Sequence, residues 1–166
     1  MSAIAMVERL IAFDTTSALS NLALIDDVRA YLKGFGIDSR LTFNAEKTKA
    51  NLYATIGPKG AGGVVLSGHT DVVPVAGQKW TSDPFKVRRE GGRLFGRGTS
   101  DMKSFIAVAL HLVPELVKKN LKTPIHFAFS YDEEVGCHGA RTLIKDIVEN
   151  LPKPRVVIVG EPTMMK

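Results

Sequence analysis

The sequence predicts an α/β fold in which helices flank a mostly parallel sheet. Residues 64–66, 125–129 and 156–159 are continuous apolar runs, which are typical of strands buried on both faces. Helical segments separate the last two runs and precede the second. An alternation of strands and helices in this order indicates a layered sheet with right-handed crossovers.

Apolar spacing, caps and turn residues predict the other elements. In chain order these are a helix over 3–13, a helix from an N-cap at Asn21 to Gly34 or Gly36, strands at 39–43 and 51–56, a glycine-rich loop at 57–63, a helix at 102–119 and a helix at 139–150. The helix at 102–119 is apolar nearly all round, so it should be buried, and Pro114 should kink it.

Length and composition exclude several classes of protein. The chain has 166 residues, of which 45% are hydrophobic and 23% charged, close to globular averages and unlike collagen, coiled coils or disordered chains. This length suits one domain with its own core. The longest mostly apolar stretch, 105–113, is far shorter than the ~20 residues of a membrane helix, so we expect no membrane partner.

Two features predict a cytoplasmic location. The N-terminal sequence MSAIAMVERLIAF lacks a basic leader, so we expect it to be a helix of the mature protein and not a signal peptide. The single cysteine, Cys137, excludes an internal disulfide, and nothing else points to an oxidising compartment.

The formal net charge of +5 raises the question of a nucleic-acid partner. Lys and Arg are scattered singly or in pairs, without a basic run or an interleaved aromatic platform. We therefore expect a solvated basic surface and no nucleic-acid partner.

Side chains that bind metals follow each apolar run at its carboxyl end, and one more stands ahead of the buried helix. They are His69 and Asp71 after the first run, Asp132, Glu133 and Glu134 after the second, Glu161 after the third, and Asp101 before the helix. Ligands of open α/β sheets bind outside the carboxyl ends of the strands, so these four stretches are expected to converge. Crowded carboxylates repel unless a cation neutralises them, which favours a metal site.

Each of these residues alone also has an ordinary structural explanation. His69 could be a satisfied core histidine, and Asp101 could cap the helix that follows it. The acidic run 132–134 could complement a helix dipole, and Glu161 could belong to a turn before proline. One shared site explains all four stretches at once, whereas these explanations require four independent coincidences.

Spacing indicates different roles within the group. Residues two apart on an extended segment point the same way, so Asp71 is expected to orient the imidazole of His69 without binding the metal. Glu133 and Glu134 are adjacent and cannot bind one ion in the same way, so one should be a ligand while the other moves protons. Cys137 is expected to fill a small buried apolar position.

The other histidines and two glycine-rich stretches are not expected to contribute. His111 and His126 fall within a predicted helix and strand and should pack there, and His138 has no assigned role. Residues 57–63 lack the ending of a phosphate-binding loop, and residues 96–101 lack the third glycine of a dinucleotide fingerprint.

Five stretches of the chain together form a recognisable pattern. They are SGHTDVVPV (67–75), WxxDPF (80–85), LFGRGTSDMKSF (94–105), SYDEEVGCHGA (130–140) and VIVGEPTMMK (157–166). In their order and spacing they resemble the zinc-dependent amidohydrolase and exopeptidase family, which includes acetylornithine deacetylases, succinyl-diaminopimelate desuccinylases and carboxypeptidases. Within it, DEEVGC and GEPTMMK most resemble the acetylornithine deacetylases.

The resemblance implies a centre with two divalent metal ions. Its implied metal ligands are His69, Asp101, Glu134 and Glu161, and its implied catalytic residues are Glu133 and Asp71. Asp101 would bridge the ion held by His69 and Glu161 to the ion held by Glu134, and Glu133 would be the base and acid. Nitrogen and oxygen ligands suit zinc, with cobalt or manganese as substitutes. A cis peptide bond between Asp101 and Met102 is also implied.

The implied activity is removal of the acetyl group from N-acetyl-L-ornithine, which gives ornithine and acetate for arginine biosynthesis. The partner would then be a small N-acylated amino acid. A desuccinylase or dipeptidase of the same family is one alternative, and a non-catalytic metal-binding fragment is another. Members of the family are more than twice as long. Residues 1–166 are therefore expected to be part of a catalytic domain, without the lid and dimerisation domain of a full-length homodimer.

Overall fold

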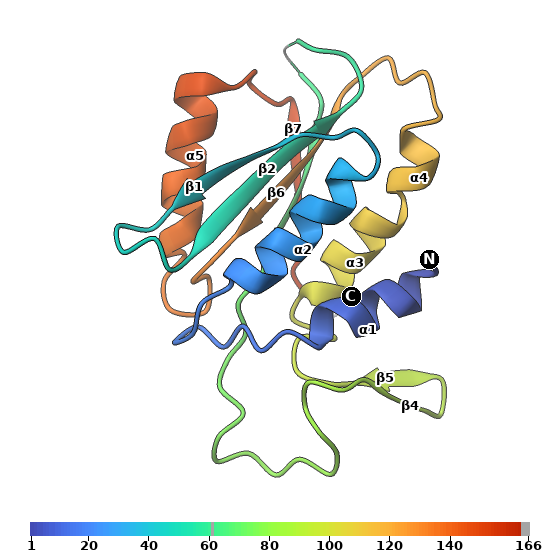
Figure 1. The fold of residues 1–166 in the computed structure, drawn as a ribbon, viewed down its shortest axis with the longest axis vertical. Coiled ribbons are helices and arrows are strands. Elements are labelled where there is room, and N and C mark those ends of the chain that lie inside the picture. Colours follow the sequence, from blue (N-terminus) through green and yellow to red (C-terminus); the bar gives the residue numbers. More distant parts are fainter. Residues whose placement is uncertain (61, 164–166) are drawn as a thin grey trace.

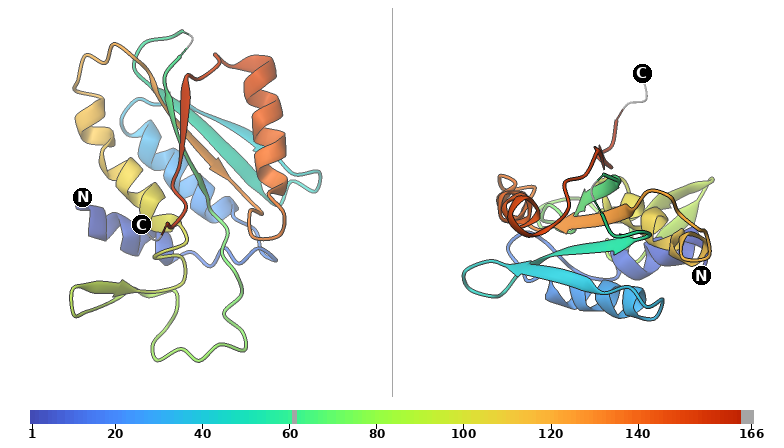
Figure 2. Two further views of the ribbon diagram at one scale, coloured as in Figure 1. Left: turned by 180° about the vertical axis from the view of Figure 1, so that it is seen from behind. Right: turned by 90° about the horizontal axis from the view of Figure 1, so that it is seen from above.

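A computed structural model describes residues 1–60 and 62–163. The helices are α1 (Ala3–Ile11), α2 (Leu22–Lys33), α3 (Lys103–His111), α4 (Val113–Leu116) and α5 (His138–Asn150). The strands are β1 (Ser39–Phe43), β2 (Ala50–Ile56), β3 (Val64–His69), β4 (Arg88–Glu90), β5 (Arg93–Phe95), β6 (Ile125–Ser130) and β7 (Val156–Val159). Helices α1, α2 and α3 lie on one side of the sheet and α5 on the other (Figure 1, Figure 2).

The central sheet has five strands in the order β1-β2-β6-β3-β7. Strand β3 pairs in parallel with both β6 and β7, whereas β2 is antiparallel to both β1 and β6. Four of the five strands therefore run in one direction, which confirms the predicted mostly parallel sheet flanked by helices. As a result, the carboxyl ends of β3, β6 and β7 share one edge.

The core lies between this sheet and the helices on one of its faces. Leu10 of α1, Leu24 of α2 and Ile106 of α3 are fully buried against Phe127 and Phe129 of β6. Burial of such side chains is the main favourable contribution to folding, at about 1.5–3 kcal/mol each. No helix among the described residues is both long enough and apolar enough to cross a bilayer.

The prediction that all three apolar runs are buried on both faces holds for one of them. Residues 126–130 of β6 are all buried, and in β3 Val65 is buried while Val64 and Leu66 are partly buried. The prediction is wrong for β7, whose four side chains are 46–58% exposed. Strand β7 is at the edge of the sheet, and α5 packs mainly on β1, β2 and β6.

The predicted helices need three corrections. Asn21 occupies the N-cap position of α2, but its side chain pairs with the backbone of Ala50 in β2. The helix expected at 102–119 is interrupted at Leu112, because Pro114 at the start of α4 has no N–H to continue the hydrogen bonding. This helix is also not buried all round, since Val108 is 46% exposed.

Strands β4 and β5 form a hairpin that the sequence analysis did not predict. The hairpin turn contains Gly91 and Gly92, which both have positive φ angles, as a two-residue hairpin turn requires. The flanking residues are mostly charged, so the alternating apolar pattern that marks a strand is weak here.

Candidate metal centre

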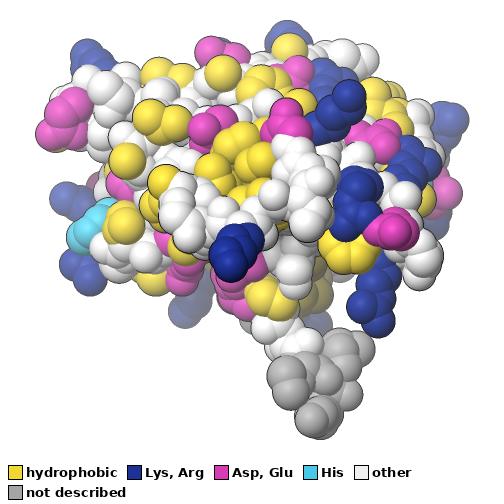
Figure 3. Space-filling model, turned by 90° about the horizontal axis from the view of Figure 1, so that it is seen from below, with side chains coloured by type: hydrophobic (Ala, Val, Ile, Leu, Met, Phe, Trp, Pro, Cys, Tyr) yellow, Lys and Arg dark blue, Asp and Glu magenta, His cyan; other side chains and the backbone are white. Residues whose placement is uncertain are grey.

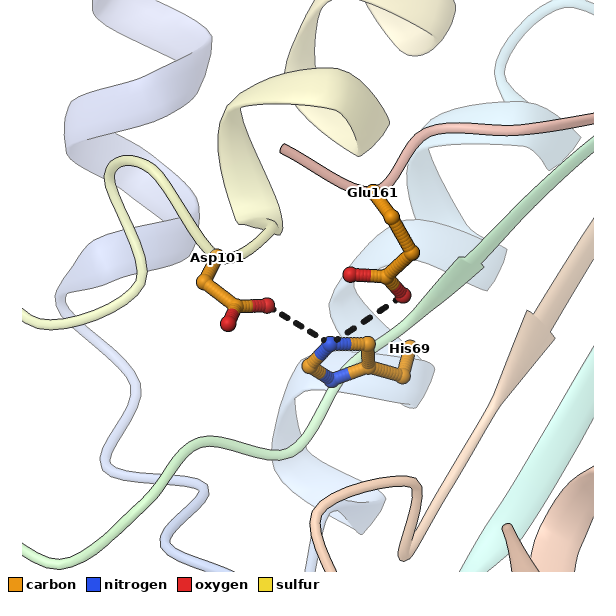
Figure 4. Close-up of side chains that lie close together, drawn as sticks. All are labelled: His69, Asp101 and Glu161. Carbon is orange, nitrogen blue, oxygen red and sulfur yellow. Dashed lines mark hydrogen bonds and ion pairs between the residues drawn. The ribbon is translucent and has the colours of Figure 1, made fainter. Parts of the chain in front are cut away.

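Three side chains from distant parts of the chain meet at the carboxyl edge of the sheet (Figure 4). His69 ends β3, Asp101 precedes α3 and Glu161 follows β7. Their ligand atoms all lie within 4.8 Å of one another. Nε2 of His69 is 3.0 Å from Oδ1 of Asp101 and 3.6 Å from Oε1 of Glu161. The structure therefore shows the convergence that the strand ends predicted.

The orientation of His69 is set by the residue two positions later. The imidazole is 1% exposed, and its Nδ1 lies 2.9 Å from the backbone oxygen of Asp71 and 3.5 Å from Oδ1 of the same residue. An Nδ1–H that donates to this oxygen leaves Nε2 free to act as a ligand. Asp71 is thus beside His69 and away from the three ligand atoms, as its spacing predicted.

Asp71 also binds the backbone of the acidic stretch 132–134. Its Oδ1 accepts a hydrogen bond from the backbone N–H of Glu133 at 3.0 Å, and its Oδ2 accepts one from the N–H of Glu134 at 3.2 Å. A third donor, the hydroxyl of Ser17, lies 2.7 Å from Oδ2. Burial favours a higher pKa for Asp71, but its bonds to His69, Ser17 and Glu133 hold that pKa below the usual value.

Glu133 and Glu134 occupy different positions. Oε2 of Glu133 is 3.9 Å from Nε2 of His69, so this carboxylate lies beside the three ligand residues. Glu134 is outside the group of three, and burial followed by the charge of Asp101 raises its pKa. The charges of Asp101 and Glu133 raise the pKa of both Glu134 and Glu161, so these four carboxylates belong to one acidic cluster.

The electrostatics of the site favour a bound cation. Burial lowers the pKa of His69, but Asp71, Glu161 and Asp101 together raise it to about 9. Burial and the charge of Asp101 raise the pKa of Glu161. Several carboxylates at one imidazole repel each other, and a divalent ion relieves that repulsion. One imidazole nitrogen and several carboxylate oxygens form a donor set that fits zinc.

Two of the ordinary explanations, those for Asp101 and for the acidic run 132–134, do not hold in the structure. The N-cap of α3 is Met102, and Asp101 makes no capping bond. Helix α5 begins at His138 and has no acidic residue in its first turn, so the run 132–134 does not complement its dipole. The peptide bond between Asp101 and Met102 is cis, as the resemblance implied.

Cys137 corrects one prediction. Its thiol is exposed and not buried, because it stands in the turn before α5 with a φ of 57°. Its Sγ lies 3.5 Å from Oε1 of Glu133. His126 is buried and stacked on Tyr53, which confirms a packing role, whereas His111 is only partly buried and bonds the backbone oxygen of Met1.

An apolar groove of about 530 Å³ leads to the site. Its lining includes Leu143, Ile147 and Val148 of α5, Val157 and Val159 of β7, and the site residues His69, Glu133 and Glu161. On the face seen from below, acidic and hydrophobic side chains lie among the basic ones, so this face carries no continuous basic patch (Figure 3).

Comparison with known families agrees with this geometry. The family described as "Peptidase family M20/M25/M40" matches residues 65–166, which include His69, Asp101 and Glu161. The chain belongs to this family. Membership in the M20/M25/M40 peptidases confirms the resemblance seen in the five sequence stretches. Of the last stretch, residues 164–166 lie outside the residues that the structure describes.

Named relatives are close in sequence but longer. The chain is 36% identical over 168 residues to the acetylornithine deacetylase of Pasteurella multocida (strain Pm70), a match that covers 97% of this chain and 43% of that protein. It is also 36% identical over 171 residues to the acetylornithine deacetylase of Buchnera aphidicola subsp. Schizaphis graminum, which covers 99% and 44%. The chain therefore spans less than half the length of these relatives.

Solved structures of the M20 family share the fold. The M20 family metallo-carboxypeptidase Sso-CP2 from Sulfolobus solfataricus superposes with a TM-score of 0.82 at 21% identity, covering 96% of this chain and 37% of that one. Human carnosine dipeptidase 1 superposes with a TM-score of 0.80 at 18% identity, covering 98% and 39%. At these identities the likeness establishes the fold alone.

Proposed function

We propose that this chain forms the metal-binding part of an enzyme that hydrolyses the acetyl amide of N-acetyl-L-ornithine. The observation that carries the proposal is the meeting of His69, Asp101 and Glu161 beside the carboxylate of Glu133. Two relatives named acetylornithine deacetylase, each 36% identical to the chain, support this substrate.

The centre would hold two divalent ions, with zinc preferred and cobalt as a substitute. His69, Asp101 and Glu161 would hold the first ion, since their ligand atoms already lie together. Glu134, with Asp101 shared, would hold the second. Bound ions would lower the pKa of the attacking water and place positive charge beside the oxygen of the scissile amide.

Glu133 then moves the protons. Its carboxylate takes a proton from the attacking water, whose oxygen forms a bond to the acetyl carbon. The same proton passes to the departing amine as the C–N bond breaks, which gives acetate and ornithine. Water is thus added across the amide without any other reactant. Asp71 keeps His69 in its tautomer and holds the backbone N–H groups of Glu133 and Glu134.

The same proposal gives the substrate, the cellular location and the oligomeric state expected of the enzyme. A small N-acylated amino acid would be the partner, and arginine biosynthesis in the cytoplasm the setting. A homodimer remains a prediction for the full-length enzyme.

The direct test is an assay of the full-length, metal-loaded enzyme on three substrates, because this chain spans less than half the length of its relatives. We expect release of acetate from N-acetylornithine, and slower reaction of N-succinyl-diaminopimelate and of dipeptides. Preference for the succinylated substrate or for a dipeptide would move the chain to another member of the M20/M25/M40 family. Metal binding without hydrolysis of any substrate would favour a non-catalytic metal-binding chain.

A further inference from the structure

The hydroxyl of Ser17 touches the site from a segment that precedes the residues matched to the family. Its Oγ lies 2.7 Å from Oδ2 of Asp71, and the side chains of both residues are buried. Ser17 is in the loop between α1 and α2, 54 residues before Asp71 in the chain. Among the described residues, Ser17 has the one side-chain hydroxyl that bonds the carboxylate of Asp71. The other groups around that carboxylate are the ring of His69 and the backbone N–H groups of Glu133 and Glu134.

Backbone pairing fixes the register of this contact. Residues 15–17 run beside residues 70–72, with an isolated parallel bridge between Thr16 and Val72. The N–H of Ser17 donates to the oxygen of Val72 at 3.1 Å, and the N–H of Val72 donates to the oxygen of Thr15 at 3.2 Å. This ladder holds the hydroxyl of Ser17 opposite the carboxylate of Asp71.

A second contact ties Ser17 to the segment that carries Glu133 and Glu134. The ammonium of Lys49 donates to the backbone oxygen of Ser17 and pairs with the carboxylate of Asp132. The side chains of Lys49 and Asp132 are only 13% and 15% exposed, so this pair is poorly screened by water. The backbone of Ser17 is therefore tied to the acidic segment through Lys49, and its hydroxyl is tied to that segment through Asp71.

We propose that Ser17 is a positioning residue of the metal centre, which fixes the carboxylate of Asp71 and thereby the places of His69, Glu133 and Glu134. Three hydrogen bonds, from the hydroxyl of Ser17 and the backbone N–H groups of Glu133 and Glu134, restrain the plane of this carboxylate. Loss of the hydroxyl leaves Oδ2 of Asp71 with the long 3.2 Å bond to Glu134 alone. The carboxylate can then rotate. Rotation weakens its hold on the backbone N–H groups of Glu133 and Glu134 and on the imidazole of His69.

The proposal rests on the proposed metal centre, so its test first measures that centre. Wild-type protein is titrated with Co²⁺, and the visible absorption of the bound ion gives affinity and coordination. Ser17→Ala is expected to weaken Co²⁺ binding by about 10–100-fold, the usual effect of losing a group that supports metal ligands. Ser17→Thr keeps the hydroxyl and is expected to restore binding. Ser20→Ala is the matched control, because the hydroxyl of Ser20 bonds only the backbone of Thr48 and Leu22 nearby.

A second readout needs no metal. Hydrogen exchange of the Glu133 and Glu134 amides, measured with chelator present, should be faster in Ser17→Ala and unchanged in Ser20→Ala. Wild-type protein that binds no Co²⁺ would overturn the proposed function itself. Wild-type binding with equal affinity and exchange in Ser17→Ala would overturn the role of Ser17 alone. Equal losses in Ser17→Ala, Ser17→Thr and Ser20→Ala would also overturn it, since they would indicate general loosening of the loop.

Discussion

Nε2 of His69 lies 3.0 Å from Oδ1 of Asp101, although 32 residues separate the two in the chain. The imidazole is 1% exposed and the carboxylate is 49% exposed. Asp101 therefore approaches the buried histidine from the solvent side. In the proposed centre, this exposed carboxylate would be the ligand that the two ions share.

The first prediction concerns this shared carboxylate. Asp101→Asn keeps the shape of the side chain and removes its charge, so we expect it to abolish tight binding of both ions. Calorimetric titration with Zn²⁺ measures the number of sites. Circular dichroism should stay unchanged, since Asp101 does not cap α3. The exposed Asp26 of α2 provides the control, Asp26→Asn. Two tight sites in Asp101→Asn would exclude a bridging role.

The second prediction separates proton transfer from metal binding. Glu133→Gln removes the base but leaves the metal ligands in place, so Zn²⁺ affinity should be retained. In the full-length enzyme, hydrolysis of N-acetylornithine should fall by about 10²–10⁴-fold, the usual contribution of a general base. Steady-state kinetics and metal analysis of one preparation check both expectations. Glu149→Gln, on the exposed face of α5, should behave as wild type. Near-normal turnover in Glu133→Gln would remove Glu133 from the mechanism.

The meeting of the site residues could be predicted from the sequence, because parallel strands end at the same edge of a sheet. His69 ends β3 and Glu161 follows β7, so the topology alone brings them together. The place of Asp71 followed from its spacing from His69. Ser17 was missed, because a serine in a polar loop has neither periodicity nor a motif that connects it to a residue 54 positions later.

Burial was predicted less well than convergence. The four apolar residues of β7 are typical of a buried strand. Burial depends on which other elements cover the strand, and the sequence of the strand itself does not show this. The same reason applies to Cys137, whose exposure follows from the turn before α5. The hairpin of β4 and β5 was missed since its glycine pair stands between charged residues.

The third prediction is a pH dependence of stability. Burial lowers the pKa of His126, and the hydrogen bond to the backbone oxygen of Gly62 offsets this only in part. The imidazole therefore binds a proton more readily in the unfolded chain, where its pKa is about 6.5. Stability is then complete above this pKa and falls as the pH drops below it, by at most about 1.4 kcal/mol per pH unit.

Urea unfolding at pH 7.5, 6.5 and 5.5 checks this sign. His69 is present in both wild type and His126→Phe, so its own contribution to the pH dependence cancels when the two slopes are compared. His126→Phe keeps an aromatic ring beside Tyr53 and cannot titrate. The free energy of unfolding should fall more steeply with acid in wild type than in His126→Phe. Identical slopes would show that His126 titrates alike in both states.

The fourth prediction concerns the exposed edge strand. Val156 to Val159 are four apolar side chains in a row, each about half exposed, on a strand that pairs on one side with β3. Exposed apolar edge strands pair readily with other chains, and a charge on the edge opposes this. We therefore expect the 166-residue chain to self-associate as its concentration rises.

Sedimentation velocity of the chain and two variants tests this expectation. Val157→Lys places a charge on the edge and in the apolar groove, so it should shift the chain towards monomer. Val117→Lys makes the same change at an apolar residue that is 37% exposed, follows α4 and belongs to no strand, and it should leave association unchanged. Wild type that stays monomeric at high concentration would contradict the prediction. If both lysine variants shift the chain towards monomer equally, association depends on overall charge and not on β7. If only Val157→Lys does so, association occurs through β7, because only that lysine disrupts strand pairing.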